Sequence, residues 1–325
     1  MCLKTAKPDR MDAMIPRKFD RPALEAMLSG LRPKLHRYCA RMAGSVIDGE
    51  DIVQETLIKA LQAVDGSMTV ERPEQWLFRI AHNAAQDHLR RRHRERSRMT
   101  ETDMTTIEDP SGSADARLAA AAGLRSFMQL SVAQRGAVIL VDVLGLSLHE
   151  TCEVIGATLA ATKAALHRGR AQLRLLAAEP EQAAAPRLDA DDERRLRRYV
   201  DLFNARDFDA VRALIAEDVQ LEVVNRLRLR GKAEVSTYFG NYDRISDWTL
   251  SLGFVDGRPA ILIRNPQEPD GAVRGFMLVE WRDERVVQIR DFRYAPWCLV
   301  DAEISTVEGP ASLEPAPSRA SGFVP

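Results

Sequence analysis

The most informative part of this chain is Trp76-Leu77-Phe78-Arg79-Ile80-Ala81-His82-Asn83, which continues through Asp87-His88-Leu89-Arg90-Arg91-Arg92-His93-Arg94. Its apolar residues recur at the spacing of an amphipathic helix. The C-terminal half of this helix is strongly cationic. Such a helix can dock on its own domain through its apolar face and offer guanidinium groups to phosphate. Most charge runs are only solvated helix ends, so the run by itself leaves both interpretations open.

A second pattern lies upstream, at Asp51-Ile52-Val53-Gln54-Glu55-Thr56-Leu57. Together the two patterns resemble the promoter-melting domain of bacterial RNA polymerase sigma factors, specifically the extracytoplasmic-function (ECF) group. The resemblance implies that Asp51, Gln54 and Glu55 contact core RNA polymerase. It also implies that the second helix binds and opens promoter DNA at the minus-ten element. The residues that match this second motif are Trp76, Asn83, Asp87, Arg90 and Arg91.

Length and composition set limits that agree with this interpretation. A chain of 325 residues has room for two or three domains. No apolar run approaches a membrane span, and the first residues lack the apolar core of a signal peptide. We therefore expect a cytoplasmic protein with no membrane contact. The cysteines are far apart and lack C-x-x-C spacing, so we expect reduced thiols, with no metal site and no cofactor. They are Cys2, Cys39, Cys152 and Cys298.

The charge is distributed unevenly along the chain. Residues 1–178 hold 26 of the 46 Lys and Arg residues but 21 of the 47 Asp and Glu residues. The remainder is therefore acidic, with 20 basic and 26 acidic residues. A basic front half and an acidic back half suggest a nucleic-acid-binding part joined to a part of another kind.

A second helical block is expected between Leu118 and Leu176. Ser147-Leu148-His149-Glu150 forms a capping-box pattern, and the helix that it starts ends at Gly156. A basic helix from about Thr158 to Leu175 follows. Two short helices around a glycine are typical of a helix-turn-helix, whose second helix enters the major groove. On pattern alone, an ordinary helical hairpin remains an alternative.

This block resembles the second ECF domain, which reads the minus-thirty-five element. The resemblance rests on Leu130–Arg135, Val141–Ser147 and Leu166–Arg170. It implies DNA docking, chiefly on phosphate, by Thr158, Lys163, His167, Arg168 and Arg170. The family usually has valine and arginine where this chain has Thr162 and Ala165. We therefore expect weak intrinsic affinity for this element or an unusual promoter.

ECF sigma factors commonly end near the end of this second block, but here about 140 residues follow it. Residues 188–216 predict two helices, and segments rich in branched and aromatic residues predict strands after them. The expected strands are Val219–Asn225, Trp248–Val255, Pro259–Arg264, Gly275–Trp281 and Arg285–Tyr294, with a short helix at Lys232–Phe239. Helices followed by a strand meander indicate an α+β domain. This order resembles the SnoaL-like cone fold, which in a subset of ECF sigma factors modulates the sigma domains.

The C-terminal domain is expected to be a regulator or a small-ligand sensor. Relatives with the cone fold include cyclases and isomerases that use Asp and often His, but all six histidines precede residue 180. Acid–base work would then need a carboxylate with a raised pKa, such as Asp218, Glu222, Asp247 or Asp291. We therefore expect no enzyme activity. A pocket for a small hydrophobic ligand would be lined by Tyr199, Phe203, Trp248, Asp291 and Tyr294.

The expected architecture has two all-α sigma domains, the second a helix-turn-helix, and a C-terminal α+β cone-fold domain that contacts them within the chain. The expected order is sigma region 2 at 19–98, an acidic linker at 99–117, sigma region 4 at 118–177, a linker at 178–188, the SnoaL-like domain at 189–302 and a disordered tail at 303–325. The function implied is promoter-specific initiation by an ECF sigma factor. Two alternatives remain, a helix-turn-helix regulator that does not bind polymerase and a fusion to a cyclase or isomerase domain.

Overall fold

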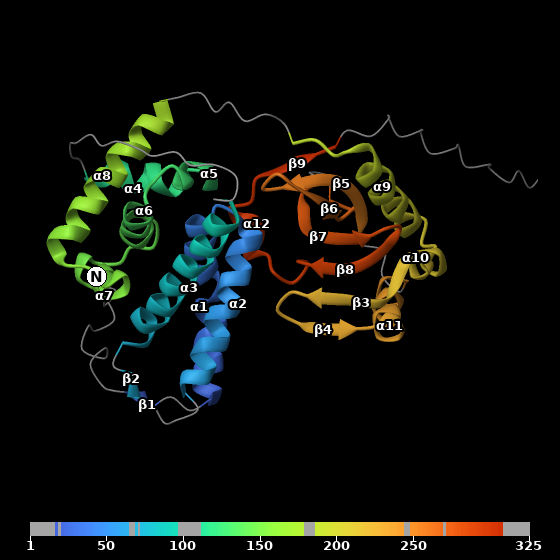
Figure 1. The fold of residues 1–325 in the computed structure, drawn as a ribbon, viewed down its shortest axis with the longest axis horizontal. Coiled ribbons are helices and arrows are strands. Elements are labelled where there is room, and N and C mark those ends of the chain that lie inside the picture. The colour runs from blue at the N-terminus through green and yellow to red at the C-terminus, as the bar shows by residue number, and fades with distance from the viewer. Residues whose placement is uncertain are drawn as a thin grey trace, which may run out of the picture. The chain divides into compact units, whose positions relative to one another are not determined.

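The computed structural model describes residues 17–18, 21–64, 69–70, 72–96, 112–178, 186–243, 248–268 and 271–307 (Figure 1). The chain divides into two compact units. The first unit comprises Met1–Ala185 together with Ala295–Glu303, and the second comprises Pro186–Tyr294 together with Ile304–Pro325. Among the described residues, no helix is both long enough and apolar enough to cross a membrane.

Three long helices make up the front part of the first unit. They are α1 (Arg21–Ala43), α2 (Val46–Val64) and α3 (Pro73–Arg96), with the strand pair β1 (Arg17–Lys18) and β2 (Thr69–Val70) beside them. Gly44 turns the chain between α1 and α2 with a φ of 76°, a conformation that disfavours side chains. At Gly49, a Cβ atom would lie 2.6 Å from the backbone nitrogen of Ala40, so glycine lets α2 approach α1 closely.

Shorter helices form the rest of the first unit. They are α4 (Gly112–Ala121), α5 (Leu124–Met128), α6 (Val132–Val138), the π-helical turn η2 (Ile139–Val143), α7 (Leu148–Ile155) and α8 (Leu159–Ala178). The capping box at Ser147 and Glu150 is present, and Gly156 ends α7 in the left-handed conformation, as the sequence predicts. Thr151 and Val154 are the buried residues of α7, and Cys152 is half-buried.

One hydrophobic core runs through both groups of helices in the first unit. Tyr38 and Phe78 of the three long helices belong to the same buried cluster as Phe127, Ile139 and Leu166 of the shorter helices. Helix α3 packs against α7, and α1 packs against α5 and α6. The two groups of helices are therefore packed together as one body.

The second unit combines helices with a mixed sheet, which confirms the expected α+β class. Helices α9 (Ala190–Asn204), α10 (Phe208–Leu214) and α11 (Lys232–Asp243) gather at one side of the sheet (Figure 1). The strands are β3 (Ile215–Val223), β4 (Leu227–Arg230), β5 (Thr249–Val255), β6 (Arg258–Arg264), β7 (Val273–Arg282), β8 (Arg285–Asp291) and β9 (Ile304–Thr306). Their order is β4-β3-β8-β7-β6-β5-β9, in which β3 and β8 are parallel and the other neighbours antiparallel.

Several segments differ from the expected organisation. Helix α4 begins at Gly112, inside the expected acidic linker, while residues 99–111 of that linker lie outside the described residues. Strand β9 falls within the segment that was expected to be a disordered tail. It is ordered because its backbone pairs with β5. Residues 308–325 of that tail lie outside the described residues. Ala295–Glu303 joins the first unit and carries a short helix, α12 (Trp297–Val300), which the sequence reasoning missed.

Candidate nucleic-acid interface

Helix α3 separates an apolar face from a polar one. Its buried face includes Leu77, Phe78, Ala81 and Ala84, all without solvent exposure. The expected minus-ten residues lie largely on the other side: Asn83, Arg90 and Arg91 are exposed, and Trp76 and Asp87 are half-buried. The spacing of apolar residues in the sequence thus predicts both the face by which the helix packs on its domain and the polar face that points outward.

The arginines of α3 make local and exposed contacts. Arg90 donates to Asp87 at 3.2 Å and to Gln86 at 2.8 Å, with its side chain 64% exposed. Arg91 donates to Glu55 at 3.1 Å with its side chain about half exposed. Exposed pairs of this kind contribute little to stability and exchange readily for phosphate contacts. Arg90 and Arg91 are therefore available to a polyanion.

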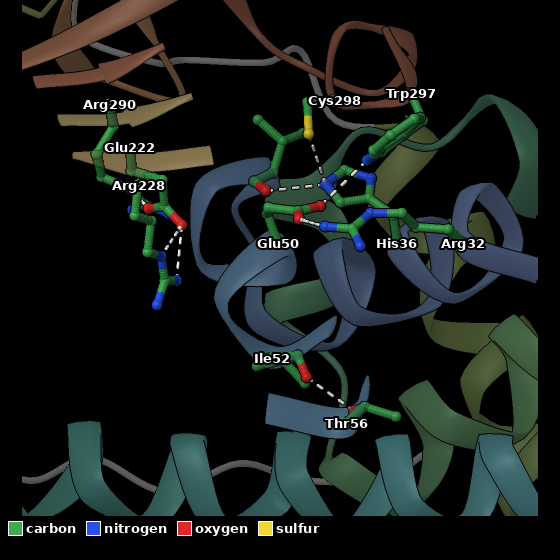
Figure 2. Close-up of polar contacts among 11 residues, drawn as sticks. Arg32, His36, Glu50, Ile52, Thr56, Glu222, Arg228, Arg290, Trp297 and Cys298 are labelled. Atoms are coloured by element: carbon green, nitrogen blue, oxygen red, sulfur yellow. Dashed lines mark hydrogen bonds and ion pairs between the residues drawn. The ribbon is translucent and has the colours of Figure 1, made fainter. Parts of the chain in front are cut away.

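Helix α2 places the expected polymerase-contacting residues beside α3. Asp51 is exposed, Gln54 and Glu55 are half-buried, and Ile52 and Val53 point inward. Partial burial would raise the pKa of Glu55, but hydrogen bonds from Lys59 and Arg91 hold it below the usual range. Glu55 therefore stays ionised and links the two expected functional helices. Thr56 follows on the buried side, donating to the Ile52 carbonyl at 2.7 Å (Figure 2).

A buried polar pair anchors α3 to α1. The Tyr38 hydroxyl lies 2.6 Å from Nδ1 of His82, and Gln86 lies 2.8 Å from its Nε2. Desolvation lowers the pKa of His82 to about 4, so the imidazole is neutral near neutral pH. Because His82 sits one residue before exposed Asn83, this anchor fixes the direction in which the polar face points.

Helix α8 places fewer of its expected residues in the open. Lys163 is exposed, His167 and Arg168 are half-buried, and Thr158 accepts from the backbone N–H of Ala161 at the start of the helix at 3.3 Å. Thr162 and Ala165, the two departures from the family pattern, are buried at 1% and 6% exposure. They therefore belong to the packing face of this helix.

Arg170 of α8 has a structural partner. Its guanidinium donates to both carboxylate oxygens of Asp142, at 2.9 and 2.6 Å, and the Asp142 side chain is 2% exposed. This hydrogen bond raises the pKa of Arg170. Arg174 makes the same two-pronged contact with Asp115, at 2.8 and 3.2 Å. The resemblance implies that Arg170 contacts DNA, but in the structure its ion pair with Asp142 joins α8 to η2.

A basic cleft opens where α3 meets the shorter helices of the same unit. It has a volume of about 1070 Å³. Its lining comprises Gln86, Asp87, Leu89, Arg90, Arg91, Arg92, His93, Arg94, Met128, Val132 and Arg135. Arg135 is buried and donates to the backbone carbonyls of Met42 and Leu130. Three of the expected minus-ten residues therefore line a cleft. Its other wall is formed by Met128, Val132 and Arg135 of the shorter helices.

The expected pocket of the second unit is largely a closed aromatic core. The ring of Phe203 packs edge-on against Trp248 at 5.1 Å and against Tyr242 at the same distance, and Tyr199 lies 5.7 Å away. The structure thus brings Tyr199, Phe203 and Trp248 together. Tyr294 is separate from them, since it is 44% exposed and Arg226 lies over its ring.

Asp291 is held by two tyrosines that the sequence reasoning did not identify. Tyr238 and Tyr242 donate to the same oxygen of this carboxylate at 2.5 and 2.9 Å, and Asp291 is 1% exposed. Burial raises the pKa of both tyrosines. The i, i+4 spacing of the two tyrosines was the signal available in the sequence, but the predicted helix ended at Phe239, whereas α11 continues to Asp243 and so includes Tyr242.

The other carboxylates considered for acid–base work make ion pairs or lie elsewhere. Glu222 accepts from Arg228 at 2.7 Å and from Arg290 at 3.0 Å (Figure 2). Asp218 accepts from Arg282, which lowers its pKa. Asp247 lies outside the described residues. Both Glu222 and Asp218 are thus paired with arginine side chains.

Comparisons with known proteins agree with this architecture. Residues 27–95 match the family Sigma-70 region 2, residues 124–173 match Sigma-70 region 4, and residues 196–289 match the SnoaL-like domain. The ECF RNA polymerase sigma factor SigG of Mycobacterium tuberculosis is 31% identical over 224 residues, which cover 59% of this chain and 59% of that protein. SigE of Mycolicibacterium smegmatis is 34% identical over 160 residues, covering 47% of this chain and 61% of that protein.

Among solved structures, the sigma factor RpoE in complex with the anti-sigma factor NepR from Bartonella quintana is 26% identical. It covers 48% of this chain and 98% of that one, with a TM-score of 0.38. The chain spans about three fifths of the length of the first curated relatives that it matches.

Proposed function

The chain belongs to the ECF sigma factors and carries a SnoaL-like domain behind its two sigma regions, and from this premise we propose that it binds core RNA polymerase and directs it to specific promoters. Region 2 corresponds to helices α1 to α3, and region 4 corresponds to helices α4 to α8. In this proposal Asp51, Gln54 and Glu55 contact polymerase, and the outward face of α3 binds the minus-ten element. Helix α8 docks on the upstream element, with Lys163 as its exposed cation.

The observation that carries the proposal is the outward face of α3. Asn83, Arg90 and Arg91 are exposed on a helix whose opposite face is fully buried, and Arg91 reaches Glu55 of the expected polymerase helix. A basic helix with a rigid dock and a polar outer face suits a nucleic-acid strand. Contact between Glu55 and Arg91 couples polymerase binding to DNA binding through adjacent side chains.

The shared core of regions 2 and 4 supports a closed resting form. The minus-ten and minus-thirty-five elements are roughly 25 base pairs apart, which is roughly 85 Å along a duplex at about 3.4 Å per base pair. Domains packed through one hydrophobic core cannot reach both elements at once. We infer that the two regions separate on polymerase, and that the SnoaL-like domain modulates this step.

A small hydrophobic ligand could act through the second unit. Among the described residues, the buried Tyr199 hydroxyl and the Trp248 indole nitrogen have no hydrogen-bond partner. Buried polar groups of this kind are rare and call for an explanation. They support a proposal that the aromatic core opens to admit a ligand with polar acceptors, which would give the domain a signal to respond to.

Run-off transcription with core polymerase tests the role of the extension. The full chain is compared with a truncation ending after Ala178, on a template from upstream of its own gene. Higher activity of the truncation makes the extension an inhibitor. If the truncation is inactive but still binds core, the extension is required for initiation, and the idea of a built-in inhibitor is wrong.

Co-purification with core polymerase tests the sigma assignment itself. The double variant Gln54→Ala/Glu55→Ala is expected to lose core binding at least about tenfold, since each contact is worth about 1 kcal/mol or more. The matched control is Glu217→Ala/Gln220→Ala, which removes the same side-chain types from exposed positions of β3. Undiminished co-purification of the first variant would refute the assignment of this helix as the polymerase contact. A failure of the unaltered chain to co-purify would favour a helix-turn-helix regulator that works without polymerase.

A further inference from the structure

A nine-residue segment of the C-terminal part belongs to the helical unit. After β8 ends at Asp291, the chain contributes Ala295–Glu303 to the first unit and returns as β9 beside β5. Ala295 and Cys298 are fully buried. Helix α12 within this segment packs against α1 and α2. Both ends of the segment are thus anchored in the SnoaL-like sheet while its middle is docked on region 2.

The first half of the segment contacts a polar cluster on region 2. The Trp297 indole donates to Glu50 at 3.1 Å, and the Arg32 guanidinium lies over the Trp297 ring at 5.4 Å (Figure 2). Arg32 also makes an ion pair with Glu50, which has no solvent exposure. The Cys298 sulfur lies 3.3 Å from Nε2 of His36. Each of these groups on region 2 is buried and paired in the docked state.

The second half of the segment reaches region 4. Asp301 accepts two hydrogen bonds from Arg41, one of them 2.9 Å long, and the Arg41 side chain is 3% exposed. The same guanidinium lies 5.6 Å from the ring centre of Phe127 in α5. Glu303 makes an ion pair with Arg125, also in α5, at 2.7 Å. One short segment therefore contacts α1, α2 and α5.

We propose that Ala295–Glu303 is a releasable clasp that holds region 2 and region 4 in the closed form. This inference rests on the proposed sigma function. The clasp docks on the buried side of α2 at Glu50, while neighbouring Asp51 stays exposed. The expected polymerase face is therefore open in the clasped state, and the clasp acts on separation of the two regions, with core binding left intact.

The polar cluster fits a protein lock better than a metal site. His36, Glu50 and Cys298 have ligand atoms within 4.8 Å of one another. However, Nε2 of His36 lies 2.9 Å from the Val46 carbonyl, which can only accept, so this nitrogen carries the proton. Glu50 is neutralised by Arg32. A cation would have to displace both contacts.

The covalent arrangement makes the clasp releasable. A segment tethered at both ends has an effective concentration in the millimolar range or above, so weak contacts suffice to keep it docked. Its contacts combine the packing of the short helix α12 with ion pairs and hydrogen bonds of single side chains. A change in the sheet that strains either anchor, at the end of β8 or at Ile304, would be transmitted along the chain to Asp301. This gives the SnoaL-like domain a physical means to control the sigma regions.

Hydrogen exchange on the full chain tests the clasp. Asp301→Asn removes the charge that pairs with Arg41, and we expect exchange in α5 to rise about tenfold, because a charged hydrogen bond contributes more than a neutral one. Run-off transcription should rise with it, while core co-purification stays unchanged. The control is Asp201→Asn, the same change at an exposed position of α9. If exchange rises in α12 but α5 stays as slow as in the unaltered chain, the segment is packing only and the proposal fails.

A charge swap guards against a general folding defect. Glu303→Arg is expected to speed exchange in α5, and the double variant Arg125→Glu/Glu303→Arg should restore it, because both side chains are nearly half exposed and tolerate either sign. Absence of rescue overturns the role of this contact. Loss of core binding in the unaltered chain would instead refute the sigma function, so the two failures are distinguishable.

Discussion

Helices α3 and α8 both carry several arginines in their C-terminal halves but use them differently in the structure. In α3 the side chains of Arg90 and Arg91 are 64% and 51% exposed and contact neighbouring residues near the surface. In α8 Arg170 is 21% exposed and grips Asp142, a nearly buried carboxylate from η2. A bidentate pair with a buried carboxylate stabilises the packing of helices, whereas an exposed arginine can exchange its partner for a phosphate. Charge density alone does not separate these roles.

The largest effect should come from breaking the ion pair of Arg170 in α8. Arg170→Ala leaves Asp142 buried without its partner, and we expect the free energy of unfolding of the helical unit to fall by about 3 kcal/mol. Denaturant unfolding followed by circular dichroism measures it. Arg170→Lys keeps the charge but loses the two-pronged geometry, so it should recover only part of the loss. A change within about 0.5 kcal/mol for Arg170→Ala would return this residue to the DNA surface.

A smaller effect is expected from pH at the anchor of α3. The folded-state pKa of His82 is about 4, below its ordinary value of 6.5, so between these values the unfolded chain binds more protons. Stability is therefore lost as pH falls through this window. From about pH 6.5 to about pH 5 the loss from His82 is about 1.6 kcal/mol, because the slope reaches its limit of about 1.4 kcal/mol per pH unit only below about pH 6.5.

The variant His82→Asn should flatten this pH dependence, whatever constant penalty it adds. His36 remains in that variant and contributes in the same direction, because burial lowers its pKa too. The control is His167→Asn, a change at a half-buried position of α8. An unchanged slope for His82→Asn would show that this imidazole is protonated in the folded protein.

The smallest effect on stability should come from the exposed arginines of α3. Arg90→Ala/Arg91→Ala is expected to change the free energy of unfolding by no more than about 0.5 kcal/mol. Its affinity for promoter DNA with core polymerase should fall, and the slope of log affinity against log salt should become less steep by about 1.4 to 1.8. Filter binding over a salt series measures this slope. An unaltered slope would remove these arginines from the interface.

The same contrast shows how far sequence reasoning reaches. Apolar spacing predicts α3 and its buried face, and Ser147, Glu150 and Gly156 correctly mark the ends of α7, because these signals are local. The resemblance implied a DNA contact for Arg170. Its partner Asp142 lies 28 residues away, and no local pattern reveals that pair. Asp301 and Arg41 are 260 residues apart, so the docking of α12 on region 2 was beyond the same reasoning. In the cone-fold domain the aromatic residues were recognised, but the contact of Asp291 with two tyrosines was not.

We infer that regions 2 and 4 are closed in the free chain and separate to initiate transcription. Arg72 of region 2 and Glu153 of region 4 form an exposed ion pair at 2.6 Å, which makes them suitable for a reversible link. Run-off transcription is measured for Arg72→Cys/Glu153→Cys, joined by a short thiol-cleavable crosslinker, with Cys2 and Cys152 replaced by serine. We predict efficient crosslinking of the free chain, loss of transcription while linked, and recovery when the link is cleaved. Full transcription by the linked protein would contradict the account.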